Sequence, residues 1–380
     1  MKGRAAILGV AQTVHEREKP DQTFADLAFD VVSGALEDAQ MTIQDVDTII
    51  TVSNDFWDGR TISSMALMDA VGGYGKNVST VEGDGTFGAF YGLMRVLSGS
   101  YRTCLVVAHC KASEGQPNLI NNGMFDPIYY RRLGLDALSS AALQARRYMD
   151  KYGVSEEQCA LVSVKNHGNA RRNPCAQMPL DVSVEDVMAS QMLAEPIKAL
   201  DASPLGDGAC AMILGDEYTA KHASRRPVWV KGVGTCADAY FLGDRDLAEV
   251  DALVRAARTA YDQADVSDPR RDIDVAEVFD GFSYQELMWL EGLGFCERGA
   301  AGRLTESGAT TLSGRIPVNP SGGVLSAHPP LVAGLVRLAE AALQVRGEAG
   351  EHQIDGVRTA LAHGTNGPCG QSHCVWIVGR

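Results

Sequence analysis

A weak internal repeat in the sequence limits the folds that are open to this chain. In the first half, an apolar strand-like run at residues 4–13 precedes a helical segment and a charged lead-in to a second strand. The same order recurs in the second half, at residues 226–235, 251–266 and 271–282. The two lead-ins match at Asp45-Val46-Asp47 and Asp272-Ile273-Asp274, which lie 227 residues apart. Strand, helix, Asp-hydrophobic-Asp and strand, occurring twice, predict two copies of one α/β unit.

Each copy continues into a glycine-rich turn that opens a helix. In the first copy the turn is VEGDGTFGA (81–89), and an apolar strand follows at 104–113. In the second copy the turn is NPSGGVLSAHPP (319–330), and a strand follows at 358–367. Between the halves, residues 115–200 hold mostly helical patterns, with loops rich in Asn, Pro and Gly. This alternation predicts layered α/β sheets, and because no low-complexity linker separates the halves, we expect them to pack tightly together.

Composition and charge exclude several classes of protein. The chain has 380 residues, 45% hydrophobic and 22% charged, which is enough for two globular units with their own cores. A net charge of −14 argues against nucleic acid as a partner, because phosphate binding needs a basic face. Nine scattered cysteines without a CxxC pair favour reduced thiols over disulfides or a metal site. No stretch approaches membrane-spanning length, and together these features predict a cytoplasmic protein without membrane association.

The turn at 81–89 is a candidate site for chemistry. Sharp strand-to-helix turns often hold a nucleophile at a helix N-terminus, where free amide N–H groups stabilise negative charge. This turn carries neither Cys nor Ser, only Asp84 and Thr86. Two interpretations therefore stay open, a tight structural connection and a site from which the nucleophile is missing. The spacing of apolar residues predicts that the core-facing side of the following helix carries Phe87, Phe90, Leu93, Met94 and Leu97.

Four segments, in order along the chain, resemble motifs of the thiolase superfamily and especially its sterol-carrier-protein-like branch. They are SVKNHGNARRNPCAQM (163–178), SPLGDGACAMILG (203–215), VFDGFSYQELMWLEGLGFCERGAAGRL (278–304) and VNPSGGVLSAHPP (318–330). The resemblance spans essentially the whole chain and implies two βαβαβαββ halves in a five-layer αβαβα sandwich. It assigns residues 1–114 to the first half, 115–200 to its helical loop region over the active site, and 201–380 to the second half. It also implies a homodimer.

The resemblance shows what the turn lacks. In the family the turn reads roughly V-E-x-x-C-A-S-G, with an acyl-accepting Cys at the helix start. On this chain that Cys falls on Gly85, and the last Gly of the motif falls on Gly88. The turn is therefore similar to superfamily members without the Cys, such as steroid side-chain aldolases, which cleave a β-hydroxyacyl-CoA by retro-aldol chemistry. The family's His-Asp or Asn-Glu pair reads Phe279-Asp280 here, whereas the His of its G-H-P motif is retained as His328.

Candidate catalytic residues follow from these matches. His328, in a rigid turn rich in Gly and Pro, is the first candidate for a general base, with a capping or buried structural role as the alternative. Asp84 is a second candidate base or a helix cap, and Asp280 either orients a catalytic water or is a structural carboxylate. Cys369, near the C-terminus, is a candidate acid/base or displaced nucleophile, or a small buried thiol. Candidates for an oxyanion site within the glycine-rich turns are Gly83, Gly85, Gly88 and Gly323.

Four further residues are candidates for contacts with coenzyme A or the acyl group: His167, Arg171, Arg172 and Tyr284. His167 lies in the K-N-H-x-N segment, which is a loop near the pantetheine in the resembled family. The arginine pair is placed to reach a CoA phosphate, with a solvated surface as the alternative. Ordinary packing stays open for Tyr284. No residue is expected to bind a metal.

The resemblance implies an enzyme that makes or breaks a carbon–carbon bond next to the α-carbon of a CoA thioester, without a covalently bound cofactor. Retro-aldol cleavage of a β-hydroxyacyl-CoA is the first hypothesis, because it needs a base and an enolate-stabilising site but no acyl-enzyme. An atypical β-ketoacyl-CoA thiolase for a bulky or aromatic acyl group is the first alternative, and a non-catalytic acyl-CoA-binding subunit is the second. Cys-deficient relatives also work with a small zinc-ribbon/OB-fold subunit, so zinc is expected only in such a partner.

Overall fold

The computed structural model describes residues 4–380, in which strands and helices alternate along most of the chain. The strands are β1 (Ala5–Gln12), β2 (Thr48–Val52), β3 (Asn77–Val81), β4 (Thr103–Lys111), β5 (Met192–Ala194), β6 (Ile197–Lys198), β7 (Asp207–Asp216), β8 (Val228–Ala237), β9 (Val275–Glu277), β10 (Thr359–Asn366) and β11 (Ser372–Gly379). The helices are α1 (Phe24–Ala39), α2 (Asp55–Asp58), α3 (Gly85–Leu97), α4 (Pro117–Gly123), α5 (Ala137–Tyr152), α6 (Glu156–Ala170), α7 (Val184–Ala189), α8 (Glu217–His222), α9 (Asp251–Ala264), α10 (Pro269–Asp272), α11 (Ser283–Gly292), α12 (Ala301–Glu306), α13 (Gly323–Ser326) and α14 (Ala333–Arg346). Residues 1–3 of the predicted first half lie outside this range.

The strands of the two halves form one continuous sheet. Its order is β3-β2-β4-β7-β1 in the first half and β8-β11-β10-β9 in the second, and β1 joins β8 through the antiparallel pairs Ala6–Trp229 and Ile7–Val228. In the second half, Val318 takes the position that β3 has in the first half. It lies beside β9 and forms a single parallel bridge to Ala276 of that strand. The two halves therefore repeat the same strand order about the β1–β8 seam, as the duplicated sequence predicts.

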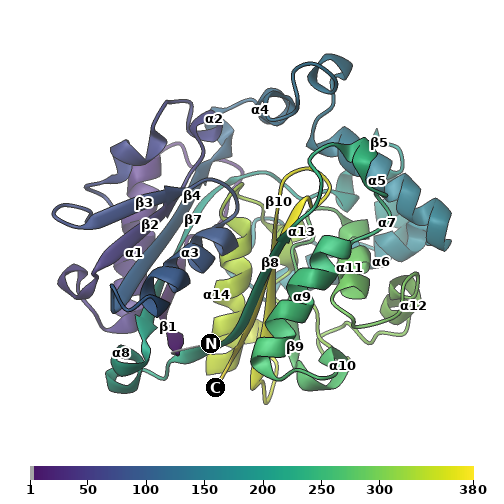
Figure 1. Cartoon of the computed structure of the whole chain (residues 1–380). Coiled ribbons are helices and arrows are strands. Elements are labelled where there is room, and N and C mark those ends of the chain that lie inside the picture. Colours follow the sequence, from purple (N-terminus) through teal and green to yellow (C-terminus); the bar gives the residue numbers. More distant parts are fainter. Residues whose placement is uncertain (1–3) are drawn as a thin grey trace.

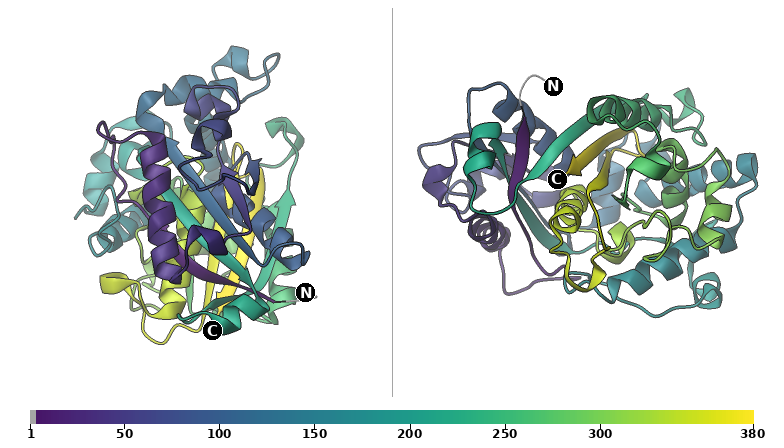
Figure 2. Two further views of the ribbon diagram at one scale, coloured as in Figure 1. Left: turned by 90° about the vertical axis from the view of Figure 1, so that its left-hand side faces the viewer. Right: turned by 90° about the horizontal axis from the view of Figure 1, so that it is seen from below.

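Helices and half-sheets stack in five layers. Helix α1 covers the outer face of the first half-sheet, and α3 and α14 pack against each other between the half-sheets. Helix α9 covers the outer face of the second half-sheet, with α11 beside it. The two halves lie side by side, the first in purple to blue and the second in green to yellow (Figures 1 and 2). The predicted five-layer αβαβα sandwich is confirmed.

Local sequence explains where the outer helices begin and which face they bury. Thr23 caps α1 and shares a capping box with Asp26, so both the backbone and the side chain fix the first turn. In α9 the buried positions follow helical spacing: Leu253, Ala256, Ala257 and Ala260. Because these side chains are mostly small, α9 lies close to β8. Within residues 4–380 no helix combines the length and the apolar character that a membrane crossing requires.

The repeated Asp-hydrophobic-Asp motif has the same structural role in both halves. In the first half, the carboxylate of Asp47 accepts hydrogen bonds from the N–H groups of Arg102 and Thr103, at 2.7 and 3.2 Å, where β4 begins. In the second half, Asp274 accepts bonds from the N–H groups of Arg358 and Thr359, at 2.8 and 2.9 Å, where β10 begins. Each motif thus ties the entry of one strand to the start of its neighbour.

Helix α3 packs the predicted apolar residues against the core with one exception, Met94. Met94, expected in the core, is 37% exposed, and the buried face carries small residues such as Gly88 and Gly92. A Cβ atom at Gly88 would overlap the side chain of Val52 on β2, and one at Gly92 would lie 3.0 Å from Val106 on β4. The helix therefore needs glycine to approach the sheet, a requirement that apolar periodicity does not reveal.

The shared role of the two aspartates gives a matched pair of stability predictions. Replacing either Asp47 or Asp274 by Ala removes a carboxylate that accepts two backbone hydrogen bonds, so we expect each change to lower the free energy of unfolding by about 1–2 kcal/mol. Denaturant unfolding followed by circular dichroism measures the loss. Asp262→Ala, at an exposed position of α9, is the control and should leave stability unchanged or slightly raised. Unfolding curves of the Asp47 and Asp274 variants that are the same as the wild-type curve would contradict this role.

Candidate active site

The carboxyl ends of the parallel strands from both halves meet at one edge of the fold. Strand β3 ends at Val81 and leads into the turn before α3, while β9 leads directly to Phe279 and Asp280. The two halves touch here, because the N–H of Gly85 donates to the carbonyl of Leu331, just before α14, at 2.7 Å. In Figure 1 this edge faces the top, toward α2 and α4. Open α/β sheets commonly place their functional residues at such an edge.

Asp84 caps α3 and connects it to α14. Its side chain is buried; Oδ1 accepts hydrogen bonds from the N–H and the hydroxyl of Thr86, and Oδ2 accepts one from the N–H of Gly334 at 2.8 Å. Burial raises the pKa of this carboxyl to about 6, and the hydrogen bonds from Thr86 and Gly334 oppose the rise. Because protein donors occupy both oxygens, the structure supports the helix-cap interpretation rather than a base that meets substrate.

The turn before α3 does not form the predicted oxyanion site in this conformation. The N–H of Gly85 is bonded to Leu331, and the N–H groups of Phe87 and Gly88 are bonded to the carbonyl of Asp84, at 3.0 and 3.4 Å. Gly83 has a φ of 129° and packs against the side chain of Asn366, so its glycine serves the backbone conformation. The amides at the helix start are therefore directed to protein oxygens.

No side chain fits at residue 85. A Cβ atom there would lie 2.5 Å from the Cβ of Leu335 on α14 and 3.2 Å from the carbonyl oxygen of Leu331. The first distance is far below van der Waals contact, so a larger residue would require α14 to move. Helix α14 thus occupies the space beside the start of α3.

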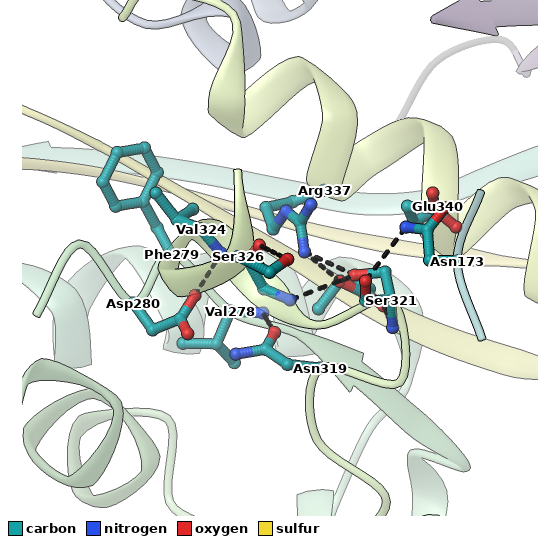
Figure 3. Close-up of polar contacts among 12 residues, drawn as sticks. Asn173, Val278, Phe279, Asp280, Asn319, Ser321, Val324, Ser326, Arg337 and Glu340 are labelled. Atoms are coloured by element: carbon teal, nitrogen blue, oxygen red, sulfur yellow. Dashed lines mark hydrogen bonds and ion pairs between the residues drawn. The ribbon is translucent and has the colours of Figure 1, made fainter. Parts of the chain in front are cut away.

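Asp280 is a buried cap rather than a residue open to solvent. It accepts a hydrogen bond from the N–H of Val324 at the start of α13, at 2.5 Å (Figure 3). It also accepts one from the Asn166 amide at 2.6 Å. Burial, and then the neighbouring carboxylate of Glu286, raise the pKa of Asp280 to about 8. A Cβ at Gly323 would overlap the Asp280 carboxylate, so this glycine makes room for the cap instead of forming an oxyanion site. The proposed water-orienting role is not supported.

A buried polar network holds the two loops of this region. The Glu286 carboxylate accepts hydrogen bonds from the side-chain amides of Asn166 and Asn319, at 2.7 and 2.9 Å, and forms an ion pair with Lys165. Asn319 in turn accepts a bond from the N–H of Val278 at 2.7 Å (Figure 3). The loop before α11 and the turn before α13 are thus fixed to helix α6.

A second buried network lies beside the first, at the start of α13. The Arg337 guanidinium on α14 donates to the Ser321 hydroxyl at 2.6 Å (Figure 3). It also forms an ion pair with Glu277 at the same distance. Ser321 also donates to Glu277. Because a buried charge is costly without its partner, this pair strongly restricts the position of the turn that carries His328.

His328 is held on one side and open on the other. Its Nδ1 lies 2.7 Å from the Ser203 hydroxyl oxygen, and its ring packs edge-on against Phe279 with centroids 5.5 Å apart. Within residues 4–380, Nε2 has no hydrogen-bond partner. Desolvation lowers the pKa of His328 to about 4, so the imidazole is neutral at physiological pH. Of the predicted catalytic residues, His328 alone is half-buried and presents a polar atom without a partner in the described part of the chain.

Cys369 does not have the environment of a nucleophile. It is buried, and its Sγ lies 3.1 Å from the carbonyl oxygen of Ser140. Burial raises its pKa to about 11, so the thiol stays protonated. Burial likewise raises the pKa of the thiols of Cys104, Cys110, Cys159, Cys175, Cys210, Cys296 and Cys374. The small-buried-thiol interpretation of Cys369 therefore holds.

The four residues predicted to contact coenzyme A are not brought together. His167 lies on helix α6, not on a loop, and is fully buried with Nδ1 3.1 Å from the carbonyl of Met178. Tyr284 is buried in α11 and its hydroxyl donates to Gln144 at 2.9 Å. These two residues pack within the fold, so their predicted ligand contacts are not supported.

The arginine pair lies on the surface. Arg171 forms an ion pair with Asp181 at 2.9 Å, with both side chains exposed. Arg172 lines a hollow of about 950 Å³ together with Arg270 and Arg315. This hollow lies beside the start of β9, at Asp274, and thus at the opposite end of the strand from Phe279. A CoA phosphate bound at Arg172 would therefore lie away from His328.

Comparison with known proteins identifies the family. A family model described as thiolase C-terminal domain-like matches residues 234–380. The chain is 37% identical to an acetyl-CoA acetyltransferase of Methanothermobacter thermautotrophicus over 384 aligned residues, covering 99% of both chains. The chain belongs to the thiolase superfamily.

Within the thiolase superfamily, the relatives point to the sterol-carrier-protein-like branch. The chain is 28% identical to sterol carrier protein 2 of Bos taurus, covering 96% of this chain and 70% of the relative. A solved structure described as an Ltp2-ChsH2(DUF35) aldolase superposes with a TM-score of 0.85 at 25% identity, covering 99% of this chain and 98% of that one. These relatives are consistent with an enzyme of the thiolase or lyase class, and this member has Gly85 where the family motif predicts the acyl-accepting Cys.

Two features of this thiolase-superfamily site were not predicted from the sequence. Ser203 lies in the S-P-x-x-D-G segment that carried the resemblance, but nothing in the motif connects it to His328, 125 residues away. His363 and His373 form a buried pair with their ring nitrogens 2.9 Å apart, and the N–H of Phe279 contacts His363 at 3.4 Å. His363 on β10 pairs with Val375 on β11, and His373 pairs with Thr365, so the two histidines are diagonal neighbours on adjacent strands. A predicted hairpin between these two strands could have suggested this contact from the sequence. The contact between Ser203 and His328 had no such signal.

The closed position at residue 85 gives a direct prediction. Gly85→Cys restores the family motif but places a Cβ against Leu335, so we expect a loss of about 1–3 kcal/mol in the free energy of unfolding from overpacking. The variant should form no acyl adduct with β-ketoacyl-CoA, as measured by intact-protein mass spectrometry. Gly123→Ala, on α4, where a Cβ meets no atom within 4 Å, is the control for substitution at a helical glycine. A stable Gly85→Cys variant that is readily acylated would show that the space is open.

Proposed function

We propose that this enzyme makes or breaks a carbon–carbon bond next to the α-carbon of a CoA thioester, and that its main reaction is retro-aldol cleavage of a β-hydroxyacyl-CoA. The observation that carries the proposal is the closed start of α3. Residue 85 has no side chain, and Leu335 fills the space that a cysteine would need. Chemistry through an acyl-cysteine at this position is therefore disfavoured, whereas aldol chemistry does not require it.

The proposed reaction balances without a covalent intermediate between the acyl group and the enzyme. The β-hydroxyl loses its proton, the Cα–Cβ bond breaks, and an aldehyde or ketone leaves. The electron pair passes to the thioester as an enolate, which takes up a proton at the α-carbon to give a shortened thioester. A hydrogen-bond donor to the enolate oxygen lowers the barrier most, because charge develops there. The free Nε2 of His328 is the group in the site that meets this need, either as such a donor or as the base for the β-hydroxyl.

Thiolytic cleavage of a β-ketoacyl-CoA is the second candidate. The similarity to an acetyl-CoA acetyltransferase supports it. It would require another thiol to accept the acyl group, or direct attack by free CoA. The raised pKa of Cys369 argues against this residue as the thiol that accepts the acyl group. Cys374, whose Sγ lies 3.7 Å from the carbonyl of Thr86 beside the turn, is fully buried, and its pKa is also raised by burial.

We further propose a homodimer that works with a small zinc-ribbon/OB-fold subunit. Strand β3 is an edge strand with one side unpaired within the described chain, and open edges favour pairing with another strand. The aldolase with a TM-score of 0.85 is described as a two-component Ltp2-ChsH2(DUF35) assembly, which supports the second partner. The cytoplasmic location stays a prediction.

Assembly is tested by mass. Light scattering of the purified chain at micromolar concentration should give twice 40.6 kDa. Thr80→Pro on β3 should shift it toward 40.6 kDa, because Val81 faces β2 and the N–H of Thr80 therefore points to the unpaired edge. Co-expression with a candidate zinc-ribbon/OB-fold protein should add that subunit's mass. A wild-type chain of 40.6 kDa would contradict the dimer, and full solubility and activity of the chain alone would remove the need for the second subunit.

The reaction is tested by product analysis. Incubation with a panel of β-hydroxyacyl-CoA compounds should release an aldehyde or ketone with one shortened thioester, detected by mass spectrometry. We expect His328→Ala to lower kcat/KM by at least about 100-fold, the usual size of a lost acid–base or oxyanion contact. Cys369→Ala should retain activity. A covalent acyl adduct on a cysteine, or CoA-dependent formation of two thioesters from a β-ketoacyl-CoA, would instead support the thiolase reaction.

A further inference from the structure

We propose that His363 and His373 are positioning residues that hold the backbone of Phe279 in one place at the edge of the site. They form a histidine bridge, in which the N–H of Phe279 donates to His363 and His363 donates to His373. The bridge requires each imidazole to carry its proton on Nε2. This arrangement of protons concerns the free enzyme, whereas the effect of the bridge on turnover rests on the proposed function.

The atoms of the histidine bridge allow one arrangement of protons. The backbone N–H of Phe279 can only donate, so Nδ1 of His363, 3.4 Å away, accepts and is unprotonated. A neutral imidazole with an unprotonated Nδ1 has its proton on Nε2. Nε2 of His363 lies 2.9 Å from Nδ1 of His373, which therefore accepts the second bond. The proton of His373 is thus also on Nε2.

Both imidazoles are neutral at physiological pH because they are buried. His363 is 0% exposed and His373 is 1% exposed. Desolvation, followed by the charge of Arg245, lowers the pKa of His373 to about 3. Desolvation, followed by the neighbouring His373, lowers the pKa of His363 well below its usual value. Each ring therefore has one proton to place, and a second proton would remove one of the two accepting nitrogens.

Strand pairing and an indole ring keep the two imidazoles in register. His363 on β10 and His373 on β11 are diagonal neighbours, because His363 pairs with Val375 and His373 pairs with Thr365. The Trp289 ring on α11 packs edge-on against both, with centroids 4.9 Å from His373 and 6.0 Å from His363. Enclosed between a strand pair and an indole, the rings have little room to turn over and exchange their nitrogens.

Trp289 also completes the attachment of Phe279. Its Nε1–H donates to the carbonyl of Phe279 at 2.9 Å, while the N–H of Phe279 donates to His363. Both backbone polar groups of Phe279 are thus bonded to side chains of the second half. The residue itself is half-buried, and its ring packs edge-on against His328 with centroids 5.5 Å apart. The histidine bridge therefore ties β10 and β11 to the aromatic side chain that borders the site.

Loss of His373 would act on Phe279 through His363. Without an acceptor for its Nε2–H, His363 can place its proton on Nδ1, where it opposes the N–H of Phe279. A buried N–H without an acceptor is unfavourable, so the backbone at Phe279 would shift and its ring would take several positions beside the substrate. A small misplacement in a site mainly slows the chemical step, so we expect kcat to fall while KM changes little.

Nitrogen NMR measures the histidine bridge directly. The full chain, labelled with ¹⁵N at its eight histidines, is recorded at pH 7 without substrate, and His363→Asn and His373→Asn identify the two sets of signals by their loss. We expect Nε2 to be protonated and Nδ1 unprotonated in both residues, with a scalar coupling across the hydrogen bond between Nε2 of His363 and Nδ1 of His373. A protonated Nδ1 in either residue overturns the proposal.

Two substitutions at residue 373 separate the histidine bridge from the fold. His373→Ala removes the acceptor, so His363 should show a mixture of both tautomers. His373→Asn places an amide oxygen near the position of Nδ1, so His363 should keep its proton on Nε2. Val375→Ala, which opens a cavity beside His363 in the same strand pair, is the matched control and should leave both tautomers unchanged. A His363 signal in His373→Ala equal to that of the wild type contradicts the bridge.

Kinetics with the β-hydroxyacyl-CoA panel test the effect on turnover. His373→Ala should lower kcat about tenfold, the effect of losing one orienting hydrogen bond, with little change in KM, and His373→Asn should recover most of the loss. Val375→Ala should keep the kcat of the wild type. Equal kcat in His373→Ala and the wild type, or an equal loss in Val375→Ala, would overturn the positioning role. A wild type that cleaves no member of the panel contradicts the proposed function alone, since the tautomers are measured without substrate.

Discussion

The contact between the start of α3 and helix α14 determines most of what this protein can do. Asp84 caps α3 and bonds Gly334 at 2.8 Å, while Gly85 bonds Leu331 at 2.7 Å. These bonds bring a helix of the first half against a helix of the second, at the centre of the five layers. The same approach places Leu335 where a side chain at residue 85 would project. One packing arrangement therefore joins the two halves and disfavours chemistry through a nucleophile at this turn.

Buried charge stabilises the other side of the site. Glu286, Asp280 and Glu277 are all fully buried, and each is bonded to amides, hydroxyls or a cation from another element. A buried carboxylate without such partners is strongly unfavourable, so these groups allow few alternative positions for the loops before α11 and α13. His328 follows α13 directly. Residues predicted as catalytic, such as Asp280, thus act by holding the histidine's turn in place.

The prediction from sequence succeeded for the fold and only in part for the site. Asp47 and Asp274 lie at equivalent positions, and both accept backbone hydrogen bonds at the start of a neighbouring strand. Because this role depends on residue type and local position, it is visible in the sequence as a repeated Asp-hydrophobic-Asp motif. Apolar runs identified the strands, whereas helical spacing misplaced Met94, because the glycine face of α3 buries backbone rather than side chains. The position of His328 was found from a motif. Its partner Ser203 was not identified, since a contact across 125 residues has no local pattern.

The sequence by itself determined the duplicated α/β architecture, the superfamily, the missing cysteine at residue 85 and the retained histidine at 328. These features can be recognised from residue identity, from the spacing of residues along the chain and from the residue types in turns. Only the tertiary structure decided that Asp84, Asp280 and Cys369 are buried and that His328 Nε2 has no hydrogen-bond partner among the described residues 4–380. Burial and hydrogen-bond partners depend on segments far apart in the chain, and they decide whether a carboxyl or thiol meets substrate or supports the fold.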